Sequence, residues 1–286
     1  MRPILSQLLE LLRLEQIEAD LFRGQSQDLG WGAVFGGQVL GQALSAAVYT
    51  VPADRVVHSL HGYFLRQGDV RKPIVYEVDR IRDGKSFTTR RVVAIQHGQA
   101  IFTLAASFQV VEPGFDHQSP MPLDVPPPEA LVADEVAALA WADTLPEPIR
   151  TRALAQRPIE VRSVEPINPL VPTVRPPTRK VWYRAVDPLP DDPALHRYLL
   201  AYASDFHFLT TAIQPHGASW ATPGMQVASL DHAMWFHRPF RMDDWLLHVI
   251  ESPSATGGRG LVRGQFYDRA GNLVASAAQE GLMRQR

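Results

Sequence analysis

Residues 74–108 read IVYEVDRIRDGKSFTTRRVVAIQHGQAIFTLAASF, and residues 247–281 read LHVIESPSATGGRGLVRGQFYDRAGNLVASAAQEG. The two stretches share an outline, because several landmarks recur at a constant offset of 173 residues. These landmarks are the pairs Gly84 and Gly257, Arg90 and Arg263, Gly98 and Gly271, and Ala106 and Gln279. A repeat of this length indicates a duplicated domain rather than a solenoid unit. The copies differ chemically where Ala106 in the first corresponds to Gln279 in the second.

Each copy has the pattern of one long helix followed by four long strands. The dipeptides Asp83-Gly84 and His97-Gly98 are typical of hairpin turns between apolar runs. The first copy predicts a helix at 37–49 and strands at 56–66, 74–82, 86–97 and 99–111. The second copy predicts a helix at 196–213 and strands at 226–237, 245–252, 260–268 and 273–283. We therefore expect an α+β fold in which each copy curves a sheet around a central helix and the two sheets pair edge to edge.

The rest of the chain divides into an N-terminal helix and a connector. Residues 1–15 have the leucine spacing of an amphipathic helix. Seventeen of the 24 prolines lie between Pro113 and Pro193, so this region should be mostly loop. Within it we expect one helix at 129–141 and strands at 159–164 and 180–185. The predicted domains are an N-terminal repeat at 1–115, a proline-rich connector at 116–156 and a C-terminal repeat at 157–286.

Composition excludes several classes of function. The net charge of −2 gives no indication of a nucleic-acid partner. The chain has no cysteine, which excludes disulfides, a thiolate nucleophile and a Cys-ligated metal, and fits a cytoplasmic location. No segment approaches the roughly 20 apolar residues of a membrane span. The G-x-S-x-G, H-E-x-x-H, P-loop and G-x-G-x-x-G motifs are absent, and the histidines show no metal-ligand spacing. What remains is catalysis by a carboxylate and bound water, without a metal or cofactor.

Asp205 is the carboxylate in the most unusual surroundings. The predicted helix at 196–213 is apolar on nearly every side, whereas a surface helix has a single apolar stripe. On a continuous helix, Ala201, Phe208 and Ala212 would share the face of Asp205. We therefore expect a partly buried carboxylate, which costs several kcal/mol unless partners stabilise its charge.

Four segments combine into a specific set of motifs. They are FGGQVLGQA at 35–43, HSLHGYFLR at 58–66, YASD at 202–205 and SLDHAMWFHRP at 229–239. Together with the repeat, they resemble the acyl-CoA thioesterase II family over essentially the whole chain. The resemblance implies a double hotdog fold, hydrolysis of fatty acyl-CoA to free fatty acid and CoA, no cofactor, and a homodimer or homotetramer.

The resemblance also implies a catalytic group in which an aspartate, a hydroxyl and a glutamine position a water. At the matching positions this chain has Asp205, Ser229 and Gln279. Well-known bacterial members have threonine at the position of Ser229, so this chain keeps the hydroxyl and loses the stiff β-branched side chain. The role of the hydroxyl is expected to survive with looser positioning.

The chemistry of these residue types fits thioester hydrolysis. A carboxylate can accept the proton of the attacking water, and a hydroxyl and an amide can fix that water's orientation. The developing oxyanion needs donors already aimed at it, and the backbone N–H groups of Gly36 and Gly37 at a helix start are candidates. Because Ala106 stands where Gln279 stands in the other copy, we predict one active site per chain.

A second pair of candidate catalytic residues, one other type of reaction and one non-catalytic role stay open at this stage. Asp231 and His232 look like a dyad, but adjacent strand residues point to opposite faces, which favours a structural or pocket role. A hydratase or dehydratase would need Asp205 with His207, and two residues apart on a helix these do not face each other. A catalytically inactive acyl-CoA-binding protein is a third possibility, suggested by the serine at 229.

Arg66 and Arg238 occupy matching places in the two copies and are expected to serve the fold.

Overall fold

A computed structural model describes residues 1–147 and 149–286. The α-helices are α1 (Pro3–Leu12), α2 (Gly36–Val48), α3 (Asp134–Ala138), α4 (Ile149–Ala153), α5 (Pro193–Ser204) and α6 (Phe208–Ile213). The first-half strands are β1 (Glu15–Glu18), β2 (Leu21–Gly24), β3 (Val56–Phe64), β4 (Ile74–Asp83), β5 (Phe87–Gln96) and β6 (Gln99–Gln109). The second-half strands are β7 (Ile159–Ser163), β8 (Thr178–Ala185), β9 (Met225–Ser229), β10 (Asp231–Phe236), β11 (Leu246–Thr256), β12 (Arg259–Tyr267) and β13 (Leu273–Gln285).

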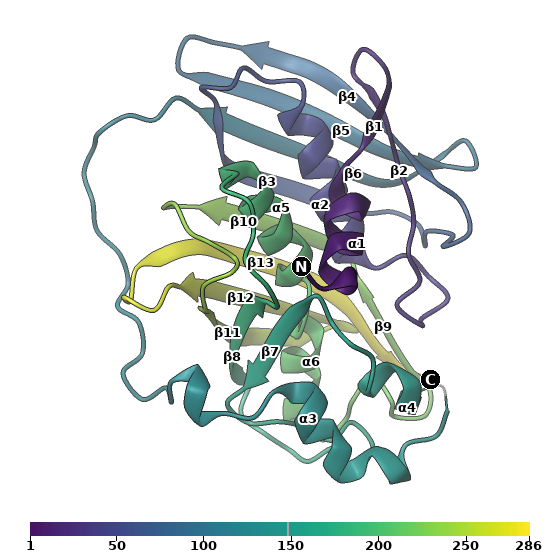
Figure 1. Cartoon of the computed structure of the whole chain (residues 1–286). Coiled ribbons are helices and arrows are strands. Elements are labelled where there is room, and N and C mark those ends of the chain that lie inside the picture. Colours follow the sequence, from purple (N-terminus) through teal and green to yellow (C-terminus); the bar gives the residue numbers. More distant parts are fainter. Residues whose placement is uncertain (148) are drawn as a thin grey trace.

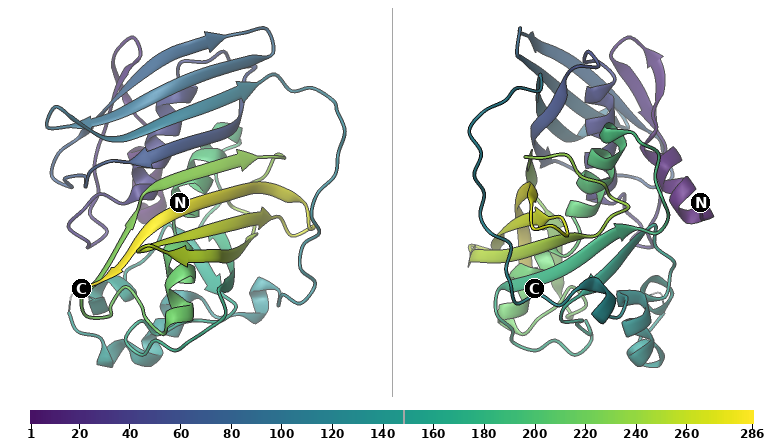
Figure 2. Two further views of the ribbon diagram at one scale, coloured as in Figure 1. Left: turned by 180° about the vertical axis from the view of Figure 1, so that it is seen from behind. Right: turned by 60° about the vertical axis from the view of Figure 1, so that its left-hand side comes forward.

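The strands of both halves join into one antiparallel sheet of 13 strands. Its order is β1-β2-β4-β5-β6-β3-β10-β13-β12-β11-β8-β7, with β9 paired to β13. The halves meet at β3 and β10, where Leu60 pairs with Met234. Figure 2 shows the strands as one curved layer with α2 and α5 behind it. The predicted edge-to-edge pairing of two helix-and-sheet units is therefore confirmed.

The two central helices are buried over most of their length. α2 is buried from Gly37 to Ala47, because the sheet curves around it and α5 covers it (Figure 1). The helices approach closely at two glycines four residues apart. A Cβ at Gly37 would stand 2.2 Å from the carbonyl oxygen of Tyr202, and one at Gly41 would stand 3.1 Å from that of Tyr198. A side chain at Gly37 would clash with the backbone of α5 and one at Gly41 would crowd it, so the two glycines allow the close packing of α2 and α5.

The predicted helix at 196–213 is wrong as a single element. α5 ends at Ser204, and α6 begins at Phe208 after His207 adopts a left-handed conformation with φ of 67°. Such a conformation costs about 1–3 kcal/mol for a residue other than glycine. Apolar spacing continues across the break and therefore could not reveal it. Asp205 consequently lies at the C-terminal end of α5 rather than on a helix face shared with Phe208 and Ala212.

Two other predicted elements are interrupted. The helix expected at 129–141 is a 3-10 turn (η1, Pro128–Ala130), the short α3 and a second 3-10 segment (η2, Leu139–Thr144). The strand expected at 226–237 is divided into β9 and β10 at Leu230. Ser229 pairs with Gly281 and Ala233 pairs with Ala278, so this strand has one residue more than β13 over the same span. The extra residue makes a β-bulge, which bends the strand and re-aims its side chains.

Candidate active site

Asp205 lies where the two halves of the molecule meet. Its half-buried carboxylate, at the end of α5, faces Gly36, the first residue of α2. A Cβ at Gly36 would stand 2.6 Å from Oδ2 of Asp205 and 3.0 Å from the ring of Phe64. The carboxylate therefore fits here only because position 36 has no side chain. The partial positive charge of a helix N-terminus also favours a negative group at this place.

Ser229 and Gln279 connect to Asp205 through hydrogen bonds. The hydroxyl of Ser229, at the end of β9, donates to Oδ1 of Asp205 at 3.2 Å. The amide Nε2 of Gln279, which is buried in β13, donates to Oγ of Ser229 at 2.7 Å. The structure thus brings together all three residues that the resemblance indicated, from three different elements. Oδ2 of Asp205 remains on the side of Gly36.

The hydrogen bonds continue beyond Gln279 to His232. Nδ1 of His232 lies 2.7 Å from Oε1 of Gln279, and Nε2 lies 2.9 Å from Oγ of Ser204. His232 is fully buried, and burial lowers its pKa below the usual value. Sequence reasoning gave this histidine a structural or pocket role and did not place it in the hydrogen-bond chain.

The β-bulge between β9 and β10 explains how His232 and Ser229 both reach Gln279. In a regular strand, residues three apart point to opposite faces. The extra residue at Leu230 restores the two side chains to one face, since the bulge makes two residues oppose one. Asp231 stabilises the bulge, because its Oδ1 accepts the N–H of Glu280 at 2.6 Å. Asp231 and His232 therefore bind different partners and form no dyad.

Gly36 and Gly37 differ in what surrounds them. Gly37 faces the carbonyl oxygen of Tyr202, which is a packing contact between α2 and α5, whereas Gly36 faces the carboxylate of Asp205. The helix begins without a side-chain cap, and the first backbone N–H groups of a helix have no acceptor within it. Gly36 and Gly37 consequently offer donors next to Asp205, as an oxyanion site requires.

The first copy lacks this arrangement. Ala106 is buried in β6 and pairs with Leu60 of β3, so neither position offers a polar side chain. Arg66 donates to the carbonyl of Ala100 at 2.7 Å, and Arg238 donates to that of Leu273 at 2.9 Å. These matching contacts anchor corresponding strand ends in the two copies, as expected of residues that serve the fold.

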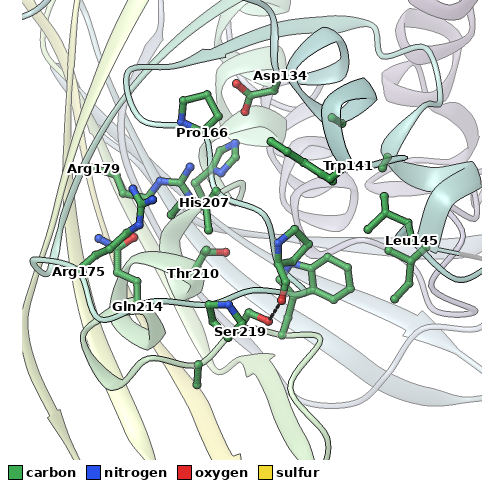
Figure 3. Close-up of a pocket in the computed structure, with 18 of the residues that line it drawn as sticks. Asp134, Trp141, Leu145, Pro166, Arg175, Arg179, His207, Thr210, Gln214 and Ser219 are labelled. Atoms are coloured by element: carbon green, nitrogen blue, oxygen red, sulfur yellow. Dashed lines mark hydrogen bonds between the residues drawn. The ribbon is translucent and has the colours of Figure 1, made fainter. Parts of the chain in front are cut away.

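A cavity of about 190 Å³ lies beside α6, under the connector. Figure 3 shows His207, Thr210, Arg179 and Trp141 around it. Neither Asp205, Ser229 nor Gln279 lines it. Among the described residues of its lining, Asp134 is the one carboxylate, and both of its oxygens accept from Ser163 at 2.7 and 2.8 Å. The carboxylate of this cavity is therefore occupied, and the group around Asp205 is the better candidate for hydrolysis by a carboxylate and water.

His207 belongs to this cavity rather than to the Asp205 group. Its ring stacks on Tyr183 with 6.1 Å between centroids, and burial lowers its pKa well below the usual value.

Over residues 1–147 and 149–286, no cluster of three acidic or histidine side chains could hold a metal ion. No helix in the described part of the chain has the length and apolarity needed to cross a bilayer.

Comparison with known proteins matches both halves of the chain to one family. The model of the acyl-CoA thioesterase family matches residues 149–282, and that of the acyl-CoA thioesterase N-terminal domain matches residues 26–109. Acyl-CoA thioesterase 2 of Haemophilus influenzae is 47% identical over 284 residues, which covers 99% of each chain.

Solved structures give the same result. The crystal structure of an acyl-CoA thioesterase II, TesB2, from Mycobacterium marinum is 44% identical, with a TM-score of 0.80 over 98% of each chain. A conserved protein with a hotdog fold from Alicyclobacillus acidocaldarius is 20% identical, with a TM-score of 0.76 over 98% of each chain, and supports the fold alone. The double hotdog fold expected from the sequence is confirmed.

Proposed function

The chain belongs to the acyl-CoA thioesterase family and hydrolyses acyl-CoA thioesters, and we propose that Asp205, Ser229 and Gln279 carry out this reaction. The observation that carries the proposal is the continuous hydrogen-bond chain from Gln279 through Ser229 to Asp205. It leaves Oδ2 of Asp205 for a water, beside the uncapped start of α2. No separate observation favours a hydratase or an inactive binding protein.

In the proposed mechanism, Asp205 is the general base. Oδ2 accepts a proton from water as the water oxygen attacks the thioester carbonyl carbon. Ser229 donates to Oδ1 and holds the carboxylate in place, while Gln279 holds Ser229. The carbonyl oxygen becomes an oxyanion, which the N–H groups of Gly36 and Gly37 stabilise. The C–S bond then breaks, the carboxylic acid product forms, and the CoA thiolate takes up the proton that Asp205 received.

A thiol-release assay with acyl-CoA substrates of several chain lengths tests the activity. We expect CoA release at enzyme-dependent rates for at least one chain length. The absence of release from every substrate in the panel, with folded protein, would overturn the assignment.

Substitutions at Ser229 separate the effect of its hydroxyl on catalysis from the effect of its side-chain size. We expect Ser229→Ala to lower kcat by roughly 10–100-fold, because it removes one hydrogen bond to a charged group, a contribution of about 1.5–3 kcal/mol. Ser229→Thr keeps the hydroxyl and is expected to retain activity within about threefold, since the lost free energy is then small. Steady-state kinetics of both variants provide the measurement. Equal losses in the two variants would show that the hydroxyl is not what matters.

Gly36→Ala tests the proximity of α2 to the carboxylate. The new Cβ would stand 2.6 Å from Oδ2 of Asp205, so the carboxylate must move, and a displacement of about 1 Å can cost about 100-fold in rate. We expect that loss in kcat with a nearly unchanged melting temperature. Gly114→Ala is the control, because a Cβ there meets nothing within 4 Å. Full activity in Gly36→Ala would move the reaction away from the start of α2.

We also propose that the protein forms a homodimer or homotetramer and that it is located in the cytoplasm. Aromatic side chains stay exposed on the outer face of the central strands, where Tyr63 is 62% and Trp235 is 37% exposed. An exposed aromatic face of this kind is typical of contacts between subunits. Light scattering coupled to gel filtration measures the oligomeric state.

A further inference from the structure

His232 is a buried histidine beside Gln279 that takes no part in the proposed proton transfers. It lies in β10, is fully shielded from solvent, and contacts both Gln279 and Ser204 through its ring nitrogens. Its two distances, 2.7 Å to Oε1 of Gln279 and 2.9 Å to Oγ of Ser204, are those of well-formed hydrogen bonds. A buried histidine with both nitrogens in such contacts is held in one orientation.

The carboxylate of Asp205 sets the direction of each hydrogen bond between Asp205 and His232. An ionised carboxylate only accepts, so Ser229 must donate its single proton to Oδ1. Oγ of Ser229 must then accept from Nε2 of Gln279, which leaves Oε1 as the acceptor toward His232. Nδ1 of His232 must therefore carry a hydrogen.

The other ring nitrogen is consistent with this direction. Burial favours the neutral imidazole, in which Nε2 is an acceptor once Nδ1 is a donor. Oγ of Ser204 lies 2.9 Å from Nε2 of His232 and also 2.9 Å from the carbonyl oxygen of Ala201. The Ser204 hydroxyl can donate to Nε2 in place of the carbonyl of Ala201, so the tautomer with hydrogen on Nδ1 leaves both ring nitrogens hydrogen-bonded. The choice of this tautomer comes from the ionised Asp205, through Ser229 and Gln279.

We propose that His232 is a positioning residue that holds the amide of Gln279 with Nε2 toward Ser229. This inference rests on the proposed function of Asp205, Ser229 and Gln279. An amide has nearly the same shape after a flip, so packing alone does not choose between its two orientations. A flipped Gln279 would present Oε1 to Ser229, which would then donate to Gln279 instead of to Asp205. The N–H of His232 prevents this, because it requires Oε1 on its own side.

Two amide substitutions distinguish a hydrogen-bond role from packing. Asparagine places its amide nitrogen where Nδ1 of His232 lies, whereas glutamine extends its amide nitrogen toward the position of Nε2. We expect His232→Asn to keep kcat within about fivefold of wild type, and His232→Gln and His232→Leu to lose about 10–100-fold, the range for one hydrogen bond in a network with a charged group. KM should stay within about threefold in all of them, because His232 is fully buried and its ring nitrogens contact Gln279 and Ser204. Equal kcat values for the asparagine and glutamine variants would overturn the proposal.

A double-mutant cycle tests whether His232 acts through Gln279. If it does, His232→Leu lowers kcat in wild type but causes no further loss in a Gln279→Ala background. A further tenfold loss in that background would contradict the inference. His248→Leu is the matched packing control: His248 is also fully buried and packs on Phe208, as His232 does, but its ring nitrogens have no hydrogen-bond partner in the described part of the chain. We expect it to keep kcat within about threefold, as for a substitution that leaves the transition state untouched.

These results are separable from a failure of the proposed function. If Asp205→Asn retains activity, the catalytic assignment itself is wrong. If Asp205→Asn is inactive while folded His232→Leu turns over at the wild-type rate, only the role of His232 is overturned. Should His232→Leu fail to fold, the comparison of asparagine with glutamine decides the question.

Discussion

Asp205→Asn is expected to lower kcat for acyl-CoA hydrolysis by about 10²–10⁴-fold, the range of a general base. Asparagine keeps the shape of the side chain, and its Oδ1 can still accept the hydroxyl of Ser229, so packing beside Gly36 is preserved. What it loses is the ability to take a proton from water. Asp205→Ala should also abolish hydrolysis while leaving the fold intact. Thiol release at saturating acyl-CoA, together with a melting curve for each variant, measures both effects.

Asp231 provides a matched control for this prediction. It is a carboxylate in the same region, but Oδ1 accepts the N–H of Glu280 at the bulge and faces neither Ser229 nor Gln279. Asp231→Asn keeps an acceptor for that N–H and should remain within about fivefold of wild type, since a hydrogen bond to a neutral acceptor retains about half the strength of one to a carboxylate. Turnover near the wild-type rate in Asp205→Asn would remove Asp205 from the mechanism. A large loss in Asp231→Asn alone would transfer the role of base to Asp231.

Much of the fold could be predicted because local signals and the repeat agree. The glycines of the hairpin turns lie at matching places, and Gly98 and Gly271 both adopt positive φ as tight turns require. The strands between them follow directly. The break between α5 and α6 could not be predicted, because it depends on one residue, His207, taking a left-handed conformation inside an apolar sequence. Tertiary packing decides such a conformation, and helical spacing does not report it.

Only part of the candidate site could be predicted from the sequence. The resemblance indicated Asp205, Ser229 and Gln279, and the structure joins them by hydrogen bonds. His232 was left out because strand alternation placed it opposite Asp231 and gave no reason to group it with Ser229, three residues earlier. The β-bulge brings Ser229 to the same face of the strand as His232. A sequence gives no signal for a one-residue shift in strand pairing. Only the structure could therefore show that His232 belongs to the hydrogen-bond network of Asp205, Ser229 and Gln279.

Buried histidines lead to a second large effect, on stability rather than rate. His196, His232 and His248 are at most 2% exposed, and burial lowers the pKa of each below 6.5. Their surroundings need the neutral ring. Nδ1 of His196 accepts the backbone N–H of Met242 at 3.1 Å, and His248 stacks on Phe266 with 3.9 Å between ring centroids. Neither arrangement offers a partner for a positive charge.

The direction of the pH effect follows from proton binding. Between about pH 6.5 and the lowered pKa of each folded histidine, the unfolded chain binds more protons than the folded chain, so the free energy of unfolding falls as the pH falls. Each such histidine contributes a loss of about 1.4 kcal/mol per pH unit once the unfolded form is protonated. For three histidines the loss between pH 7.5 and 5.5 is up to about 4 kcal/mol, a large part of a typical total of about 5–15 kcal/mol. Most carboxylates titrate lower, near pH 4, so this interval reports the histidines.

We therefore expect urea unfolding to show a markedly less stable protein at pH 5.5 than at pH 7.5, with reversible loss rather than aggregation at low protein concentration. His248→Leu should reduce this pH dependence measurably, because its linkage contribution disappears. His117→Gln, at an exposed position, should leave it unchanged. Since leucine cannot be protonated, an unaltered pH dependence in folded His248→Leu would show that protonation of this ring is not what destabilises the fold in acid. The same outcome for His196→Leu would show that protonation of His196 is not the cause either.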